Sequence, residues 1–183
     1  MQRFVEKEHL ELVRQCTKGD RKAQKKVFDL LSGKMMSLCL RYVGDHQTAL
    51  DMLQDGFVTL FSKIDTYKGD GSFEGWARRI FATTCLMYLR KNDALKMSDD
   101  LQEARLMTSD TPTQSQDVGY HELVKLISTM PEGYRAVFNL YVVEGFTHKE
   151  ISQMLGVSEI TSRTQLARAR SWLQNKIKNE NRH

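Results

Sequence analysis

The chain has 183 residues, 40% of them hydrophobic and 27% charged, which suits a globular protein with one large domain or two small ones. Its longest apolar stretch, 137–143, is too short to span a bilayer, and the acidic N-terminus excludes a secretion signal, so we expect a cytoplasmic protein without direct membrane insertion. Cysteines and histidines are scattered without the spacing of a metal clip or a catalytic set, so we expect no enzyme, no metal site and no cofactor.

A first helical module is expected over residues 1–92. Only two prolines occur in the chain, and no Asn-Gly or Asp-Gly hairpin signal separates alternating apolar runs, which favours helix throughout. Gly19 ends one helix and Asp20 is a suitable N-cap for the next. Apolar residues then follow at helical spacing: Ala23, Val27, Leu30 and Leu31. The cysteines Cys16, Cys39 and Cys85 are expected to pack as small hydrophobic residues.

Two more helices are expected in this module. One runs from about Thr48 to Ile64, and the side opposite its apolar stripe presents two acids and an amide: Asp51, Gln54 and Asp55. A glycine-rich loop follows at 67–72, and a third helix is expected from about Phe73 to Lys91. Without further information, the polar side of the first of these helices could be an ordinary solvated face.

An acidic linker is expected over residues 93–120. Between Asp93 and Glu122, seven acidic side chains face two basic ones, and the segment is rich in serine, threonine and glutamine. A second helical module is expected over 121–183. Pro131 suits a first helical turn, and Gly145 suits the end of that helix. The end of the chain, 159–183, carries six lysines and arginines against two acids, so it could meet phosphates.

The second module contains a helix-turn-helix pattern. Thr147 and Glu150 have the spacing of a capping box, in which each side chain accepts the other residue's amide. Gly156 can take the left-handed conformation of a tight turn, and Ser158 can cap the next helix. In that helix, one side is expected to be buried: Ser162, Leu166, Ala169 and Leu173.

The other side of this last helix presents arginines with small residues between them: Ile160, Arg163, Thr164, Ala167, Arg168 and Ser171. Such a face can lie in a major groove, where arginine pairs with guanine and threonine or alanine touches a thymine methyl. The alternative is a solvated amphipathic hairpin that carries arginines by chance. The pattern predicts DNA binding.

The chain resembles the extracytoplasmic-function sigma factors of the sigma-70 family. Residues 51–57, 67–80 and 88–91 are similar to their region 2, and residues 130–135, 144–151 and 169–170 are similar to their region 4. The run Gly-Ser-Phe-Glu-Gly-Trp at 71–76 is the most specific part. The resemblance implies an all-α fold with two small helical modules. It also implies a protein that binds core RNA polymerase and directs promoter-specific initiation.

The resemblance also assigns residues to DNA. For the −35 element, Arg163, Thr164 and Arg168 would face bases, while Lys149, Thr161 and Arg170 would contact phosphates. For the −10 element, the expected contacts are Lys68, Arg78, Arg79 and Arg90. Nearby aromatic side chains could stack on unpaired bases: Tyr67, Phe73, Trp76, Phe81 and Tyr88. Trp76, Ile80 and Phe81 could equally be core residues, and we favour that interpretation.

The partners follow from the same resemblance. Asp51, Gln54 and Asp55 would bind the beta-prime coiled coil of core RNA polymerase, and the beta flap of the polymerase is a further expected contact. An anti-sigma factor is a further expected partner, and the acidic linker would thread through the polymerase, although any solvated spacer would have the same composition. Thr83, Met87 and Ile160 depart from the common family pattern, so the resemblance transfers no particular promoter sequence.

Two other functions are compatible with parts of the sequence. A stand-alone helix-turn-helix transcriptional regulator would bind duplex DNA without polymerase, but it would have no use for the 51–57 patch or the glycine-aromatic loop. A helical interaction module, such as one that sequesters a sigma factor, would not need a basic recognition face.

Overall fold

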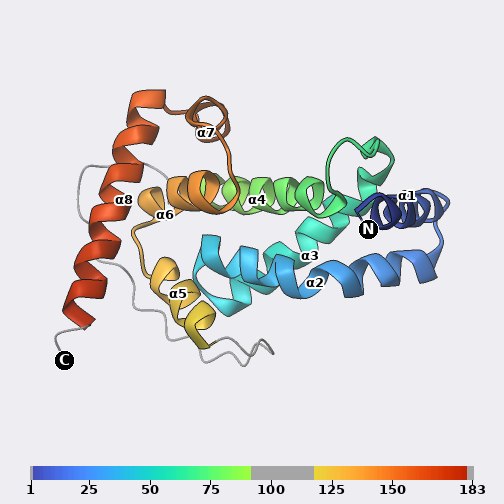
Figure 1. The fold of residues 1–183 in the computed structure, drawn as a ribbon, viewed down its shortest axis with the longest axis horizontal. Helices are drawn as coiled ribbons and strands as arrows, with labels where there is room; N and C mark the ends of the chain where they lie inside the picture. The colour runs from blue at the N-terminus through green and yellow to red at the C-terminus, as the bar shows by residue number, and fades with distance from the viewer. Residues whose placement is uncertain (1, 92–117, 181–183) are drawn as a thin grey trace.

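The computed structural model describes residues 2–91 and 118–180, and its elements in these ranges are all helical, as predicted (Figure 1). The acidic linker expected over 93–120 lies outside the described residues, except for its last three positions, which begin a helix. Across the two described ranges, no helix combines the length and apolarity that a membrane crossing requires.

The first module consists of four α-helices and one short 3₁₀ turn. These elements are α1 (Gln2–Thr17), α2 (Arg21–Val43), α3 (His46–Ser62), η1 (Ile64–Thr66) and α4 (Phe73–Lys91). The long helix α2 packs against α1, α3 and α4, and α3 also packs against α4. The bounds of α4 agree with the prediction. Helix α3 starts two residues earlier than expected and ends at Ser62, before the 3₁₀ turn.

Local caps fix where these helices begin and end. The Asp20 carboxylate accepts hydrogen bonds from the amides of Lys22 and Ala23, which confirms the predicted N-cap of α2. At the other end of α2, Gly44 adopts a φ of 86°, a conformation that a residue with a Cβ rarely takes. Asp45 then caps α3 through the amide of Thr48. The chain therefore reverses between α2 and α3 within two residues.

The core of the first module is tightly packed around Phe81 of α4. The Phe81 ring meets Phe57 edge to face, with ring centroids 5.1 Å apart. Gly56 lies directly against the same ring, since a Cβ there would come within 2.3 Å of Phe81 Cε1. All three cysteines are buried and unbridged, as expected. Leu30, by contrast, is 44% exposed, so the buried stripe of α2 is narrower than its apolar pattern.

The second module begins with α5 (Val118–Ser128) and α6 (Glu132–Phe138), continues through the π-helical turn η2 (Asn139–Val143), and ends with α7 (His148–Leu155) and α8 (Glu159–Glu180). Pro131 precedes α6 as its N-cap, one position earlier than predicted. Gly145 follows the π turn with a φ of 77° and ends the helical stretch near the expected point. Both α6 and α7 pack against α8.

The two modules share one hydrophobic core. Helices α5 and α6 pack against α2, and Ala136, Val137 and Leu140 belong to the same buried cluster as the first module's core residues. Figure 1 shows α8 standing across the end of the α2–α4 bundle. The second module therefore covers part of the surface of the first, and the contact between them includes buried polar groups such as Arg41 and Asn139.

Candidate nucleic-acid interface

Helices α7 and α8 form the predicted helix-turn-helix. The Thr147 amide donates to the Glu150 carboxylate at 2.9 Å, and the Glu150 amide donates to the Thr147 hydroxyl at 3.3 Å, so the capping box is complete. The Thr147 amide and then the Thr147 hydroxyl, which both donate to the Glu150 carboxylate, hold the pKa of Glu150 below its ordinary value. Gly156 ends α7 with a φ of 71°, and the Ser158 hydroxyl accepts the amide of Thr161 at the start of α8. Each local feature predicted for this motif is confirmed.

His148 joins the two helices of the motif in a way that the sequence did not suggest. Its Nδ1 lies 2.9 Å from the hydroxyl of Ser162, and its ring stacks on Tyr141 with centroids 4.4 Å apart. Burial, and then the charge of nearby Arg163, lower the pKa of His148, so the neutral ring is favoured. Ser162 is fully buried, which fits its predicted place on the inward side of α8.

The recognition face of α8 is open to solvent. The six residues predicted for this side are all exposed: Ile160, Arg163, Thr164, Ala167, Arg168 and Ser171. Ile160 is 76% exposed, the highest value among the large hydrophobic side chains of the described residues. Arg163 makes only an exposed ion pair, with 3.4 Å between its Nη2 and Glu159 Oε2. Such a pair contributes little stability, so the guanidinium can exchange it for a base edge or a phosphate.

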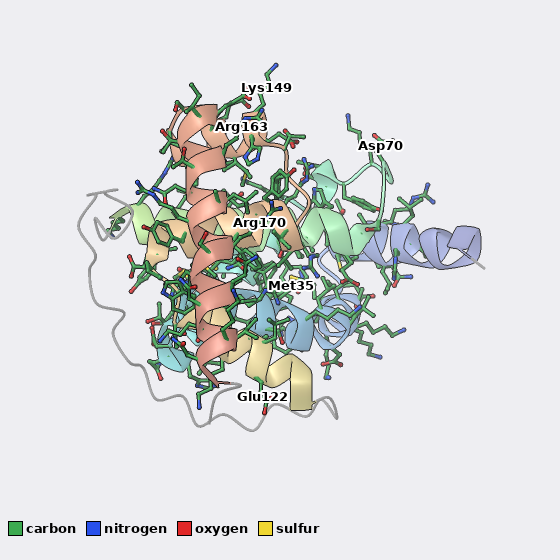
Figure 2. All side chains as sticks on the ribbon, turned by 60° about the vertical axis from the view of Figure 1, so that its left-hand side comes forward. Met35, Asp70, Glu122, Lys149, Arg163 and Arg170 are labelled. Atoms are coloured by element: carbon green, nitrogen blue, oxygen red, sulfur yellow. The ribbon has the colours of Figure 1, made fainter. Side chains whose placement is uncertain are left out.

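The residues expected to contact −35 phosphates lie around this face. Figure 2 places Lys149 and Arg163 at the same end of the helix-turn-helix, with Arg170 further along α8. Lys149 and Arg170 are exposed. Thr161 is half-buried, and its hydroxyl lies 2.8 Å from that of Ser158, so it serves the cap of α8. The structure thus brings the two expected cations to the rim of the recognition face.

The aromatic residues before and within α4 belong mainly to the core. Tyr67, Phe73 and Phe81 are at most 6% exposed, and the Tyr67 hydroxyl donates to the carbonyl of Gly71 at 2.8 Å. Phe81 is therefore a core residue, as we favoured. The aromatic residues Trp76 and Tyr88 are half-buried against the core, and so is Ile80. Of the aromatic side chains considered for stacking on bases, only Trp76 and Tyr88 keep a substantially exposed part.

The cations expected to contact the −10 element lie on α4 and on the loop before it. Lys68 is exposed on the loop. Arg78 is half-buried and pairs with Glu144 of the second module, with 2.7 Å between Nε and Oε2. Arg79 lies 3.6 Å from a carboxylate oxygen of Glu150 and over the ring of Phe146. Arg90, at the end of α4, approaches the Gly156 turn.

The patch expected to bind polymerase lies on α3, on the side away from α4. Asp51, Gln54 and Asp55 are all exposed, and Val58 beside them is 65% exposed. On the opposite side of α3, Met52, Phe57 and Leu60 are buried. The buried side fixes α3 against the core, so the acidic patch has a fixed position on the surface, next to the exposed Val58.

Two family models match the chain in the order of its modules. Sigma-70 region 2 matches residues 27–95, and Sigma-70 region 4 matches residues 120–173. The ECF RNA polymerase sigma-E factor of Haemophilus influenzae is 25% identical over 177 residues, which cover 91% of this chain and 93% of that protein. The protein of the same name from Escherichia coli strain K12 is also 25% identical, covering 91% of this chain and 92% of its own length.

Solved structures share the fold. CnrH, in complex with the cytosolic domain of CnrY, superposes with a TM-score of 0.51 at 21% identity, covering 92% of this chain and 96% of CnrH. The sigma factor RpoE, in complex with the anti-sigma factor NepR from Bartonella quintana, superposes with a TM-score of 0.56 at 18% identity, covering 84% of this chain and 96% of RpoE.

The region 2 match distinguishes the chain from a stand-alone helix-turn-helix regulator, since a terminal DNA-binding motif alone would not produce it. The region 4 match covers the helix-turn-helix and most of α8. With both regions present in order and with relatives matched over nearly their whole length, the chain belongs to the extracytoplasmic-function sigma factors of the sigma-70 family, which are non-enzymatic and direct transcription initiation.

Proposed function

We propose that the two modules divide the work of initiation. Residues 1–92 bind core RNA polymerase and open the −10 element, residues 121–183 recognise the −35 element, and the acidic segment 93–120 joins them. The observation that carries this proposal is the presence of two different surfaces on one chain. An exposed acidic patch lies on α3, and an exposed face with arginines lies on α8.

For −35 recognition, we propose that Arg163, Thr164 and Arg168 face bases. They lie on one exposed side of α8, and an arginine in a major groove can donate two hydrogen bonds to guanine. Lys149 and Arg170, at the rim, contact phosphates and fix the orientation of the helix. Thr161 supports the same contact indirectly, because its hydroxyl belongs to the cap of α8.

For the −10 element, we propose that Lys68, Arg78, Arg79 and Arg90 contact the backbone of the opened strand. Arg78 and Arg79 occupy the middle of α4 and Arg90 its last turn, while Lys68 lies in the loop that leads into the helix. Single-strand capture usually combines such cations with partly exposed aromatic rings, and Trp76 and Tyr88 are the half-buried rings of α4.

For the polymerase, we propose that Asp51, Gln54 and Asp55 bind the beta-prime coiled coil and that the second module binds the beta flap. A patch of carboxylates and an amide complements a basic partner surface and raises the rate of encounter. The chain would act in the cytoplasm. The solved relatives CnrH and RpoE are described in complexes with CnrY and with the anti-sigma factor NepR, which supports an anti-sigma factor as a further partner.

The experiment that tests the function adds the purified chain to sigma-free core polymerase and measures run-off transcripts from genomic templates. We expect specific transcripts with the natural chain. Asp55→Lys should abolish them without weakening the binding of the chain to duplex DNA, because Asp55 is exposed on α3 and is not among the residues that we propose to contact DNA. Absence of transcripts on every genomic template would overturn the proposal.

A further inference from the structure

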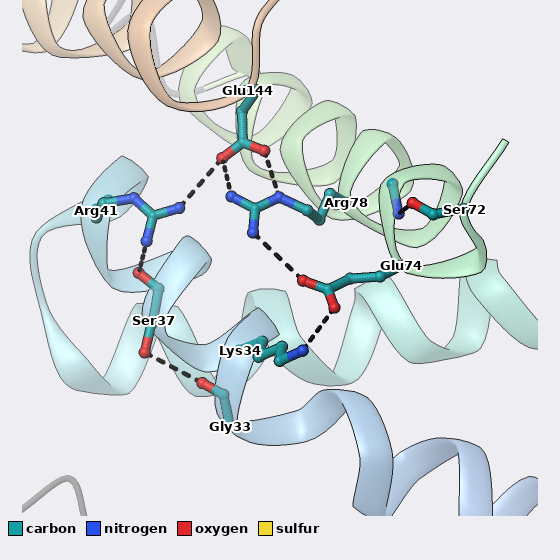
Figure 3. Close-up of polar contacts among 9 residues, drawn as sticks. Gly33, Lys34, Ser37, Arg41, Ser72, Glu74, Arg78 and Glu144 are labelled. Atoms are coloured by element: carbon teal, nitrogen blue, oxygen red, sulfur yellow. Dashed lines mark hydrogen bonds and ion pairs between the residues drawn. The ribbon is translucent and has the colours of Figure 1, made fainter. Parts of the chain in front are cut away.

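A buried carboxylate of the second module is bound by two arginines of the first. The side chain of Glu144 is only 3% exposed, and its Oε1 lies 3.1 Å from Nη2 of Arg41 on α2 (Figure 3). The same carboxylate accepts two hydrogen bonds from Arg78 on α4, at 2.7 Å from Nε and 3.0 Å from Nη2. Two elements of the first module therefore hold one acidic group of the second.

The geometry is that of an anion site. Arg78 presents the two parallel N–H donors that match a carboxylate or a phosphate, and Arg41 adds a third donor from another helix. Arg41 itself is fixed by a hydrogen bond from Nη1 to the carbonyl of Ser37 at 3.4 Å. Arg78 likewise lies 3.7 Å from Glu74 of its own helix, so each guanidinium also has a partner within the first module.

The π-helical turn η2 delivers Glu144 to this site. The Glu144 amide donates to the carbonyl of Asn139 at 2.9 Å, and the Asn139 side chain donates to the carbonyl of Arg41 at the same distance. π-helical turns are rare and occur frequently at functional sites. The turn therefore brings two polar groups of the second module, Asn139 and Glu144, onto the same residue of α2.

The next residue of α4 is also occupied by the second module. Arg79 lies over the ring of Phe146, 4.9 Å from its centroid, and pairs with Glu150. Two of the three arginines that we propose to bind the −10 strand, Arg78 and Arg79, thus have carboxylate partners from the second module, and only the partner of Arg78 is buried. A buried ion pair adds little net stability, but an arginine left without its carboxylate is costly, so a second anion must take the place of Glu144 when the modules separate.

We propose that Arg41 and Arg78 form a phosphate site that Glu144 fills while the two modules are closed and that a backbone phosphate of the −10 strand fills when the second module moves away. The inference rests on the proposed −10 role of α4 and adds Arg41 to it. The closed arrangement and −10 binding then exclude each other, and the chain restrains its own DNA binding.

The test compares Glu144→Gln with Glu74→Gln in the full chain. Glu74 pairs with Arg78 at 3.7 Å and with Lys34 at 2.6 Å, but it belongs to α4 itself. Both substitutions remove one negative charge beside Arg78, so the general electrostatic gain is common to the two, whereas only Glu144→Gln weakens the contact between modules. The readout is fluorescence anisotropy of labelled, A/T-rich single-stranded DNA over a series of salt concentrations.

We expect Glu144→Gln to bind this DNA about tenfold more tightly than Glu74→Gln at low salt, because more molecules have the site available. Its plot of log K against log salt should steepen by about 0.7, the amount for one additional phosphate contact on a single strand. Arg41→Gln combined with Glu144→Gln should lose most of the gain in affinity, because the phosphate then keeps only Arg78. Equal affinity and slope in Glu144→Gln and Glu74→Gln would overturn the proposal, as would a double variant that keeps the whole gain.

Two further measurements keep the result interpretable. Glu144→Asp retains the charge but is one methylene too short to reach all three donors. If Glu144→Gln folds poorly, Glu144→Asp should also raise the affinity for single-stranded DNA and its salt dependence. The run-off assay separates this inference from the proposed function. If transcripts appear but the two Gln variants bind single-stranded DNA equally, the phosphate site alone is refuted. If Glu144→Gln steepens the plot of log K against log salt but no transcripts appear, the sigma function alone is refuted.

Discussion

The two surfaces proposed to bind DNA differ in whether the protein leaves them open. The recognition face of α8 is exposed along its length, and the ion pair of Arg163 with Glu159 lies in solvent. On α4, Arg78 and Arg79 meet acidic side chains of the second module, and the Glu144 carboxylate is almost fully buried. The proposed −35 surface is therefore open in the free chain, whereas in the proposed −10 surface the second module covers Arg78.

Arginine–carboxylate pairs thus have different consequences on the surface of α8 and at the contact between the modules. An arginine–carboxylate pair in solvent contributes from nothing to about 1 kcal/mol, because water screens it. A buried pair adds little net stability, but removal of one member leaves an uncompensated charge and costs much more. The exposed pair on α8 can therefore exchange with another anion at once, whereas the buried pairs of Glu144 oppose separation of the modules.

The largest effect that we expect comes from Arg41→Met. The substitution keeps the aliphatic part of the side chain but leaves Glu144 with one guanidinium instead of two. The free energy of unfolding should fall by about 3 kcal/mol, at the low end for a broken buried pair since Glu144 regains water if the modules separate. Urea unfolding followed by circular dichroism measures it. Arg163→Met on α8 is the matched control, with an expected change below about 1 kcal/mol.

A second substitution tests the packing beneath α4. Gly56→Ala places a methyl group where Phe81 already lies, so α3 and α4 must move apart. We expect a loss of up to about 3 kcal/mol in the free energy of unfolding. Gly33→Ala on α2, where a Cβ would meet no atom within 4 Å, should leave stability unchanged or raise it. Equal stabilities of the two variants would show that α3 and α4 are less closely packed than described.

On the open surface, Arg168→Ala should weaken binding to duplex DNA in a sequence-dependent way. The loss should be about 1–3 kcal/mol at one base pair of the −35 element if Arg168 reads that base. Lys149→Ala should instead weaken binding to all sequences by a similar factor and lower the salt dependence. A binding titration across a set of single-base variants separates the two patterns. Uniform loss with Arg168→Ala would contradict base recognition by this residue.

The smallest expected effect is a pH dependence of the helix-turn-helix. Because the pKa of His148 is lowered in the folded chain, the unfolded chain binds a proton first, and stability should decline as the pH falls below about 6.5. Arg163 and Arg170 oppose the protonated ring, while Glu159 favours it. Melting temperatures between pH 7.5 and 5.5 measure the effect, and the window keeps the Glu150 carboxylate ionised. His148→Gln should reduce the dependence of the melting temperature on pH. An unchanged dependence would rule out His148 as its source.

The helix-turn-helix could be predicted in detail from the sequence because its determinants are local. The capping box joins residues three positions apart, and Gly156 and Ser158 act within one turn of their own positions. The same holds for Asp20, whose carboxylate binds amides two and three residues away. The exposed side of α8 likewise follows from helical periodicity, as do the buried Ser162, Leu166 and Ala169, whereas Leu173, predicted to be buried, is half-buried.

The contact between modules could not be predicted in this way. Glu144 lies 103 positions from Arg41 and 66 from Arg78, and no periodic pattern links residues so far apart. In the sequence, Glu144 stands out only as the first residue of the segment 144–151 that resembles region 4. The role of the aromatic residues on α4 also depended on the fold, since a ring beside arginines suits both a core and a base-stacking surface. Gly56, an interior glycine in a strong helix, was a usable signal of close packing that was missed.

The π turn η2 has a consequence for the length of the chain. An i→i+5 turn takes up one residue more than an α-helical turn, so loss of one residue from 139–143 would convert the segment to regular α-helix and leave Glu144 close to its present direction. Loss of a second residue would rotate everything after it by roughly 100°. Glu144 would then point away from α2 and α4 while α7 and α8 kept their own folds. Under the proposed phosphate site, the second deletion would release the restraint on −10 binding and the first would not, and neither would alter a side chain that we propose to contact DNA.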